Sequence, residues 1–192
     1  MPLRFVQAIL ALLLAPAVYF LTIEAKSRVV EELIAASRRN DAAAFAARID
    51  WDAVKNRLKD DLHDARKGGI FTANFGPSEA QIVPVVEHYI RPENVPVVFY
   101  FRDKLFKGVP EEDFIESTGF APPFGFFVTL AYPKTGPGAV SGDMRALRDR
   151  LQVRFVFRLS GMTWKVREMH VPLFMVPSQP GPLPDPKTLP KP

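Results

Sequence analysis

The sequence predicts an α+β protein that begins with an apolar helix, and three observations lead to this prediction. Residues 5–23 hold 16 apolar residues in 19 and no charged one. Helical spacing of apolar residues then dominates the first half of the chain, and strand-like alternation follows it. Helices first and strands later are typical of helices packed on a small antiparallel sheet. We expect a transmembrane anchor over 1–23, an α+β domain over 24–176 and a proline-rich disordered tail over 177–192.

The apolar N-terminal segment is long enough to cross a membrane. At 1.5 Å of rise per residue, about 19 helical residues span roughly 28 Å, close to the hydrocarbon thickness of a bilayer. Arg4 precedes the segment and favours a cytoplasmic N-terminus. This pattern predicts a single-pass membrane protein with its soluble domain outside the cytoplasm, which in a bacterium means the inner membrane and the periplasm. Two alternatives are a signal peptide cleaved at Ala15-Pro16-Ala17 and a buried core helix.

Composition excludes several classes of protein. The balance of 25 Lys plus Arg against 21 Asp plus Glu, a net charge of +4, is too mild for a nucleic-acid-binding protein. The chain has no Cys, which excludes disulfides, thiolate metal sites and a cysteine nucleophile. No phosphate-binding loop, nucleophile elbow or HExxH motif is present, so no cofactor or metal is predicted.

Three helices are expected after the anchor. Residues 24–39 carry one apolar stripe and continue the anchor as a helical stem. Asp41 is a suitable N-cap for a short helix over DAAAFAARI. Asp50 is a suitable N-cap for a helix over 51–67, whose apolar stripe consists of Val54, Leu58, Leu62 and Ala65.

The next two segments contain prolines that complicate the interpretation. A helix from Ser78 to Arg91 would hold Pro84 beyond its first turn, so a kink or a late start is expected there. Pro92 suits the first position of a helix that extends to about Phe106. The apolar run in that last segment also fits a buried strand, and the alternative stays open at this stage.

Strands are expected in the last third of the chain. Phe124, Phe126, Val128, Leu130 and Tyr132 alternate as strand residues do. Residues 153–159 alternate in the same way, Ser160-Gly161 permits a tight turn, and residues 162–171 form the return strand of a hairpin. The tail holds 7 of the 19 prolines in its 16 residues and has few large apolar groups.

Three stretches of the chain resemble a known family. They read RRNDAAAFAARIDWDAVKNRLKDDL, HYIRPENVPVV and RFVFRLSGMTWKVREMHVP. Together with the preceding helix, they resemble the bacterial membrane-anchored proteins called domain of unknown function 2939. The resemblance implies a cell-envelope location and a helix-then-sheet order, and it implies no catalytic residue. The closing strands around a Trp also look like the cone-shaped folds of the nuclear-transport-factor-2 type.

Two groups of residues are candidates for binding. Strand alternation suggests an apolar ligand pocket between sheet and helices, lined by Phe124, Phe126, Trp164 and His170. Residues 143–176 carry 7 basic against 3 acidic residues, whereas residues 70–142 carry 5 against 8. A basic contact face is therefore expected from Arg154, Arg158, Lys165 and Arg167, and internal pairing with the acidic middle is the alternative.

These observations predict a non-enzymatic function. Residues 99–127 hold 8 of the 16 Phe residues, which suggests either a core or a patch that docks on lipid or on another envelope protein. The leading hypothesis is a membrane-anchored partner-binding or accessory module of the cell envelope. The alternative is a small-molecule or lipid-binding cone. A hydrolase or isomerase that uses His170 or a buried carboxylate is a third hypothesis.

Overall fold

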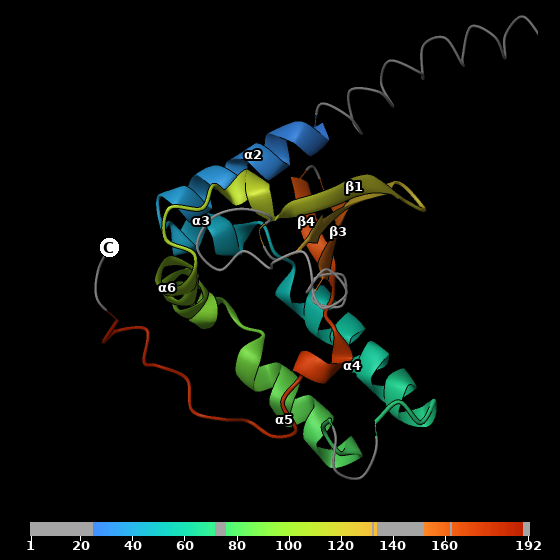
Figure 1. Cartoon of the computed structure of the whole chain (residues 1–192). Helices are drawn as coiled ribbons and strands as arrows, with labels where there is room; N and C mark the ends of the chain where they lie inside the picture. Colours follow the sequence, from blue (N-terminus) through green and yellow to red (C-terminus); the bar gives the residue numbers. More distant parts are fainter. Residues whose placement is uncertain (1–24, 72–75, 132, 134–151, 162, 190–192) are drawn as a thin grey trace, which may run out of the picture.

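Five α-helices and one four-stranded antiparallel sheet make up the described part of the chain, which confirms the predicted α+β class. The structure is a computed structural model, and it describes residues 25–71, 76–131, 133, 152–161 and 163–189 (Figure 1). The anchor predicted over 1–23 lies outside these residues. Within the described ranges, no helix combines the length and the apolarity that a membrane span requires.

The first three helices follow their predicted boundaries closely. They are α2 (Ala25–Arg38), α3 (Ala42–Ala47) and α4 (Trp51–Lys67). The side chain of Asp41 accepts a hydrogen bond from the Ala44 N–H at 2.9 Å, and Asp50 accepts one from the Ala53 N–H at 3.2 Å. Both predicted N-caps are therefore confirmed, and they satisfy backbone donors that the first helical turn leaves without a partner.

The proline-containing segments are helical. Helix α5 (Glu79–Tyr89) starts directly after its N-cap Ser78 and holds the exposed Pro84 near its middle, so the late start considered from the sequence is wrong. Pro92 opens a 3₁₀ turn, η2 (Pro92–Asn94), which leads directly into α6 (Val95–Leu105). The segment after Pro92, for which both a helix and a buried strand were considered, is therefore a helix.

The sheet consists of β1 (Ile115–Ala121), β2 (Gly125–Leu130), β3 (Val153–Ser160) and β4 (Thr163–His170), in that spatial order. The predicted hairpin is β3–β4. A short 3₁₀ turn, η3 (Glu111–Phe114), precedes β1, and another, η5 (Leu173–Met175), follows β4. Strand β1 lies at the edge of the sheet. It was not expected, because its sequence IESTGFA lacks the apolar alternation that is typical of strands.

The apolar core fills the space between the sheet and the helices. Phe126 stacks on Phe157 with ring centroids 4.5 Å apart, and its centroid lies 5.3 Å from that of Trp164. Val29 of α2 and Val54 of α4 join this cluster. A second cluster lies between α4 and α5 and is built from Leu58, Leu62, Ala65, Phe71, Ile82 and Val86.

A β-bulge in β4 reverses the predicted alternation. Phe157 is paired with Val166, whereas the preceding Val156 is paired with Glu168, so Arg167 is the extra residue. Glu168 and His170 therefore face the side of the sheet opposite to Trp164 and Val166. The prediction that His170 shares a face with Trp164 was wrong for this reason.

The free edge of β4 is joined to the helical layer. Ile49 forms an isolated parallel bridge with Val166. The Asp50 N–H donates to the Val166 carbonyl at 2.9 Å, and the Val166 N–H donates to the Arg48 carbonyl at 2.8 Å. Helix α4 begins directly after this bridge.

The tail, predicted to be disordered, is described as far as residue 189. It has no helix or strand in residues 177–189, as expected for so many prolines, but it lies along α5 and α6 (Figure 1). The Gly181 N–H donates to the Tyr89 hydroxyl at 2.8 Å. This contact could not be predicted from local sequence patterns, because its partners are 92 residues apart.

The core can be tested with two phenylalanines that face each other in the β1–β2 register, Phe120 and Phe126. Phe126 is 3% exposed and Phe120 is 61% exposed. We expect Phe126→Ala to lower the free energy of unfolding by about 3 to 5 kcal/mol, because it leaves a cavity beside two stacked rings. Phe120→Ala should change it by no more than about 0.5 kcal/mol. Urea denaturation measures both, and equal effects would contradict this description of the core.

Candidate functional site

A groove of about 770 Å³ lies between the end of α2, α3, α6 and the tail. The first half of the Phe-rich segment contributes Phe99, Tyr100 and Phe106 to its wall. Four basic residues also line it: Arg38, Arg102, Lys104 and Lys107. The tail contributes Pro186 and Leu189.

Arg102 fixes the geometry of this groove. One of its guanidinium nitrogens donates to the Ser37 carbonyl at 2.7 Å, and another donates to the Asn40 side-chain oxygen at 2.7 Å. Asp103 contacts the same guanidinium and also accepts a hydrogen bond from the Asn40 amide at 3.3 Å. These contacts hold α6 against the end of α2, so the groove is preformed by side chains from separate helices.

The aromatic rings of the groove are held at defined angles. Phe99 is 5% exposed, and its ring packs edge-on against Phe45 of α3 with centroids 5.3 Å apart. Phe106 packs in the same manner against Phe114 at 5.2 Å. The Lys104 ammonium lies 5.9 Å from the centroid of the Tyr100 ring. The groove thus combines flat apolar rings with exposed cationic groups, a lining that suits an extended peptide.

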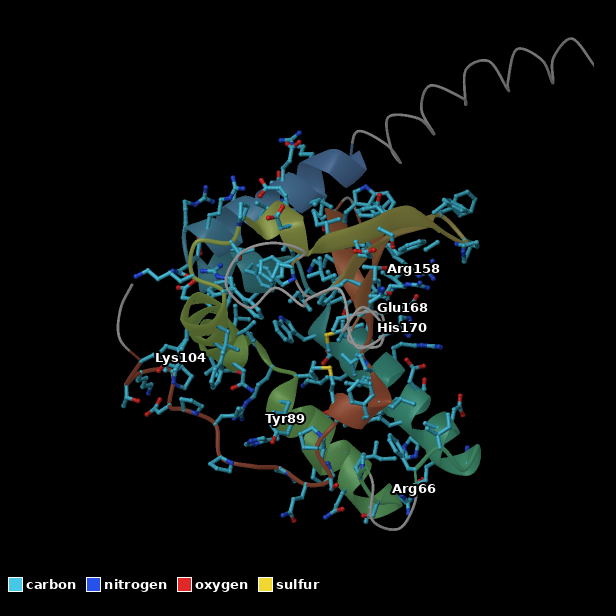
Figure 2. The ribbon with its side chains drawn as sticks, in the orientation of Figure 1. Arg66, Tyr89, Lys104, Arg158, Glu168 and His170 are labelled. Atoms are coloured by element: carbon cyan, nitrogen blue, oxygen red, sulfur yellow. The ribbon has the colours of Figure 1, made fainter. Side chains whose placement is uncertain are left out.

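The tail is held at its middle and enters the groove at its end. His88 Nε2 lies 2.8 Å from the Gly181 carbonyl oxygen, and the Tyr89 hydroxyl accepts from the Gly181 N–H. Further along, Asp185 closes a local turn by accepting from the Lys187 N–H at 2.9 Å. Figure 2 shows Tyr89 and Lys104 on the side of the domain along which the tail passes.

A second, smaller cleft of about 400 Å³ lies beside the end of β4. Asp61 and Asp64 of α4 line it together with His170, and its apolar wall is formed by Leu58, Ala65, Ile70, Val171 and Leu173. His170 Nδ1 lies 3.0 Å from Asp61 Oδ2, and its Nε2 lies 3.4 Å from Glu168 Oε2. The imidazole is therefore placed between two carboxylates, and it can donate to both only when both nitrogens carry a proton.

Glu168 connects this cleft to the β1–β2 turn. Its Oε1 lies 2.7 Å from both Nε and Nη2 of Arg158, and Arg158 Nη1 donates to the Pro123 carbonyl at 3.0 Å. Figure 2 shows Arg158, Glu168 and His170 following one another along this part of the sheet. Partial burial favours the protonated form of Glu168, but the hydrogen bond and charge of Arg158, together with those of His170, outweigh it and lower its pKa.

The residues predicted to line an apolar pocket are not brought together. Phe124 is 77% exposed in the turn between β1 and β2. Phe126 and Trp164 are buried in the packed core, and His170 is turned to the other face by the bulge. The prediction failed because Phe124 precedes the strand and because the bulge changes the register beyond Val166.

Two of the four residues of the predicted basic face form ion pairs within the domain. Arg158 pairs with Glu168, and Arg167 Nε lies 3.1 Å from Asp50 Oδ2. The Arg154 guanidinium carbon lies 4.7 Å from the centroid of the Phe127 ring. Lys165 is paired with Arg158 in the strand register. The alternative that these cations pair with residues 70–142 also differs from the structure, since Asp50 and Glu168 lie outside that segment.

Several titratable side chains of α4 and α5 have structural partners. His63 Nδ1 lies 2.7 Å from Glu79 Oε1, and so links α4 to α5. Lys55 and Lys59 both contact Glu87, at 2.8 and 2.6 Å, and their hydrogen bonds lower its pKa. Among the described residues, no group of three His, Asp or Glu side chains is arranged to hold a metal ion.

Neither a protein-family model nor a curated protein sequence matches this chain. The resemblance to domain of unknown function 2939 therefore stays a prediction. The groove at α6 and the cleft at His170 have to be interpreted from their own geometry.

The ion pair between Glu168 and Arg158 makes stability depend on pH. The folded-state pKa of Glu168 is lowered, so its contribution is present above the unfolded-state value of about 4.3 and is lost as the pH falls through the folded-state value. We expect Glu168→Gln to lower the free energy of unfolding by about 1 to 2 kcal/mol at pH 7, since Arg158 loses its charged partner.

Chemical denaturation of Glu168→Gln and the unaltered chain at pH 7 and at pH 3 measures this effect. The difference between the two proteins should shrink in acid. Glu93→Gln, at an exposed residue of η2, is the control and should show little difference at either pH. A difference for Glu168→Gln that is the same at both pH values would contradict the assignment.

Proposed function

We propose that this protein is a membrane-tethered, non-enzymatic binding module of the bacterial cell envelope. In this proposal its α+β domain stands in the periplasm and binds an extended, proline-containing segment of another envelope protein. The groove at α6 is the binding site. The observation that supports it is the position of the chain's own tail, whose Pro186 and Leu189 line that groove next to aromatic rings.

A proline-rich segment is a suitable occupant for physical reasons. Proline restricts the chain to an extended conformation before binding, so little conformational entropy is lost when the segment is ordered. Aromatic rings such as Tyr100 and Phe106 offer flat surfaces for proline rings. The tail supports this choice, because its Pro186 and Leu189 line the groove beside the turn that Asp185 closes.

Charge specifies the partner further. Arg38 contacts Glu112, and Arg102 is held by Ser37, Asn40 and Asp103. Lys104 and Lys107 are exposed at the rim of the groove. We infer that the partner segment carries an acidic residue that reaches these lysines, which would add specificity and speed association.

The membrane tether rests on the sequence of residues 5–23 and on the continuity of the chain into α2. An uncharged stretch of this length is typical of a membrane span, and α2 begins two residues after it. A tether raises the local concentration of the domain next to partners in the same membrane. A higher local concentration lets the groove bind its partner even when the intrinsic affinity for the peptide is low.

The geometry favours this function over the small-molecule or lipid-binding cone. Phe126 and Trp164 would have to line a cavity in such a protein, but they pack against each other and against Phe157. It also favours a binding module over an enzyme. The described contacts of His170 are with two carboxylates, and no hydroxyl nucleophile is among them.

The groove can be tested with a chain that lacks residues 177–192. A fluorescent peptide with the sequence of that tail should bind the shortened chain saturably. It should bind the full-length chain at least about tenfold more weakly, because the resident tail competes at a high effective concentration. Fluorescence anisotropy measures both affinities.

Matched variants locate the binding site. Tyr100→Ala in the shortened chain should abolish most of the binding, whereas Val98→Ala, on an exposed part of α6 that does not line the groove, should leave it unchanged. A peptide with alanine at the positions of Pro186 and Leu189 should bind weakly. No saturable binding by a shortened chain with an unchanged circular dichroism spectrum would contradict the proposal.

The tether is tested separately by fractionating cells that express the full chain. We expect the intact mass in the membrane fraction, resistant to extraction with alkaline carbonate, and a C-terminal reporter active only outside the cytoplasm. A soluble protein whose mass corresponds to a chain beginning after Ala17 would instead show a secreted domain and overturn the tether.

A further inference from the structure

We propose that one end of the sheet inserts aromatic side chains into the membrane interface beside the anchor. The surface consists of Phe120, Phe124 and Leu159, and we call it the apolar tip. This inference rests on the proposed tether and deepens it, because it states how the domain lies on the bilayer. Its ligand is the lipid bilayer itself.

The apolar tip is exposed although its residues are large and apolar. Phe124 is 77% exposed, Phe120 is 61% exposed and Leu159 is 45% exposed. Phe120 faces the core residue Phe126 in the strand register, and Leu159 faces the core residue Trp164. The tip therefore lies on the same face of the sheet as the core. It is at the end of the sheet that carries the β1–β2 and β3–β4 turns, where the helices no longer cover this face. An exposed apolar patch of this kind marks a contact surface.

The backbone of the β1–β2 turn holds Phe124 outward at a conformational cost. Phe124 has φ 52°, in the left-handed region that residues other than glycine rarely adopt. The next residue is Gly125, at which a Cβ would lie 2.7 Å from the Phe157 carbonyl oxygen. Arg158 fixes the turn from the other side through its hydrogen bond to the Pro123 carbonyl. Strain of this kind, supported by neighbouring contacts, is typical of functional positions.

The apolar tip lies on the same side of the domain as the start of α2 (Figure 1). Val29, in the first turns of α2, packs in the same cluster as Phe126 and Trp164, which adjoin the tip. The other end of α2 is distant from the tip, because Arg38 contacts Glu112 ahead of β1. Figure 1 shows the start of α2 and the β1–β2 turn on the same side of the domain. The apolar segment 5–23 ends two residues before α2 begins, so the proposed tether joins the described domain at the start of α2.

Charge next to the tip favours a membrane with anionic lipids. Lys165 lies in β4 close to both turns, and Arg158, its partner in the strand register, is already paired with Glu168. A cationic group beside the tip attracts anionic headgroups, while the rings of Phe124 and Phe120 enter the boundary between headgroups and acyl chains. A bilayer therefore matches both the apolar and the charged parts of this surface.

The test uses the full chain reconstituted into vesicles of phosphatidylethanolamine and phosphatidylglycerol, with bromine atoms on the lipid chains near the headgroups. Phe124→Trp introduces a fluorescent probe at the tip, and Leu159→Trp introduces a second at the neighbouring turn. Val98→Trp is the matched control, because Val98 is 60% exposed on α6, away from the tip. The unaltered chain supplies the background of Trp51 and Trp164.

We expect the brominated lipid to quench the fluorescence added by the two tip probes at least about twofold more than that added by Val98→Trp, with a blue shift of their emission. Equal quenching of tip probes and control, in protein that floats with the vesicles, would overturn this inference and leave the tether standing. Protein that does not float with the vesicles would overturn the tether and this inference with it.

Discussion

Asp50 joins the two layers of the domain, and the rest of the structure depends on this junction. Its side chain caps α4, its backbone N–H donates to the Val166 carbonyl, and its second carboxylate oxygen lies beside Arg167 Nε. The bridge between Ile49 and Val166 covers the edge of β4, which would otherwise present unpaired backbone groups. One residue thus begins the longest helix, protects the last strand and contacts the bulge.

The bulge at Arg167 and the course of α2 determine where the proposed contact surfaces lie. Beyond the bulge, Glu168 and His170 turn away from the core and join Arg158 and Asp61 in a chain of polar contacts. This chain supports the turn that displays Phe124. Helix α2 runs from the tip end of the sheet to the groove at α6, where Ser37 accepts from Arg102. The domain therefore offers one surface near the proposed membrane and another farther from it.

Local sequence patterns predicted the elements well, because the determining interactions are close in the chain. The caps Asp41 and Asp50, the stripe of α4 and the β3–β4 hairpin depend on neighbours within a few residues. Strand β1 was missed because a polar edge strand has no apolar alternation to reveal it.

The candidate sites were much harder to predict, because long-range contacts build them. The alternation that placed His170 with Trp164 fails at a bulge that no residue type announces. Two cations of the predicted basic face pair with Asp50 and Glu168, and the tail docks on His88 and Tyr89, about ninety residues earlier in the chain. The aromatic residues of the segment 99–127 are divided between the core and the surface, since Phe99 and Phe126 are buried whereas Phe120 and Phe124 are exposed.

The claim that the junction at Asp50 makes one cooperative body of helices and sheet is tested most directly by native-state hydrogen exchange. The informative amides are those of Asp50 and Val166, which make the junction's hydrogen bonds. We predict that both exchange only through global unfolding, with the same opening free energy as the slowest amides of the central strands β2 and β3. If these two amides exchanged through an opening several-fold more frequent than global unfolding, the claim would be contradicted. The sheet and the helices would then separate from each other without global unfolding.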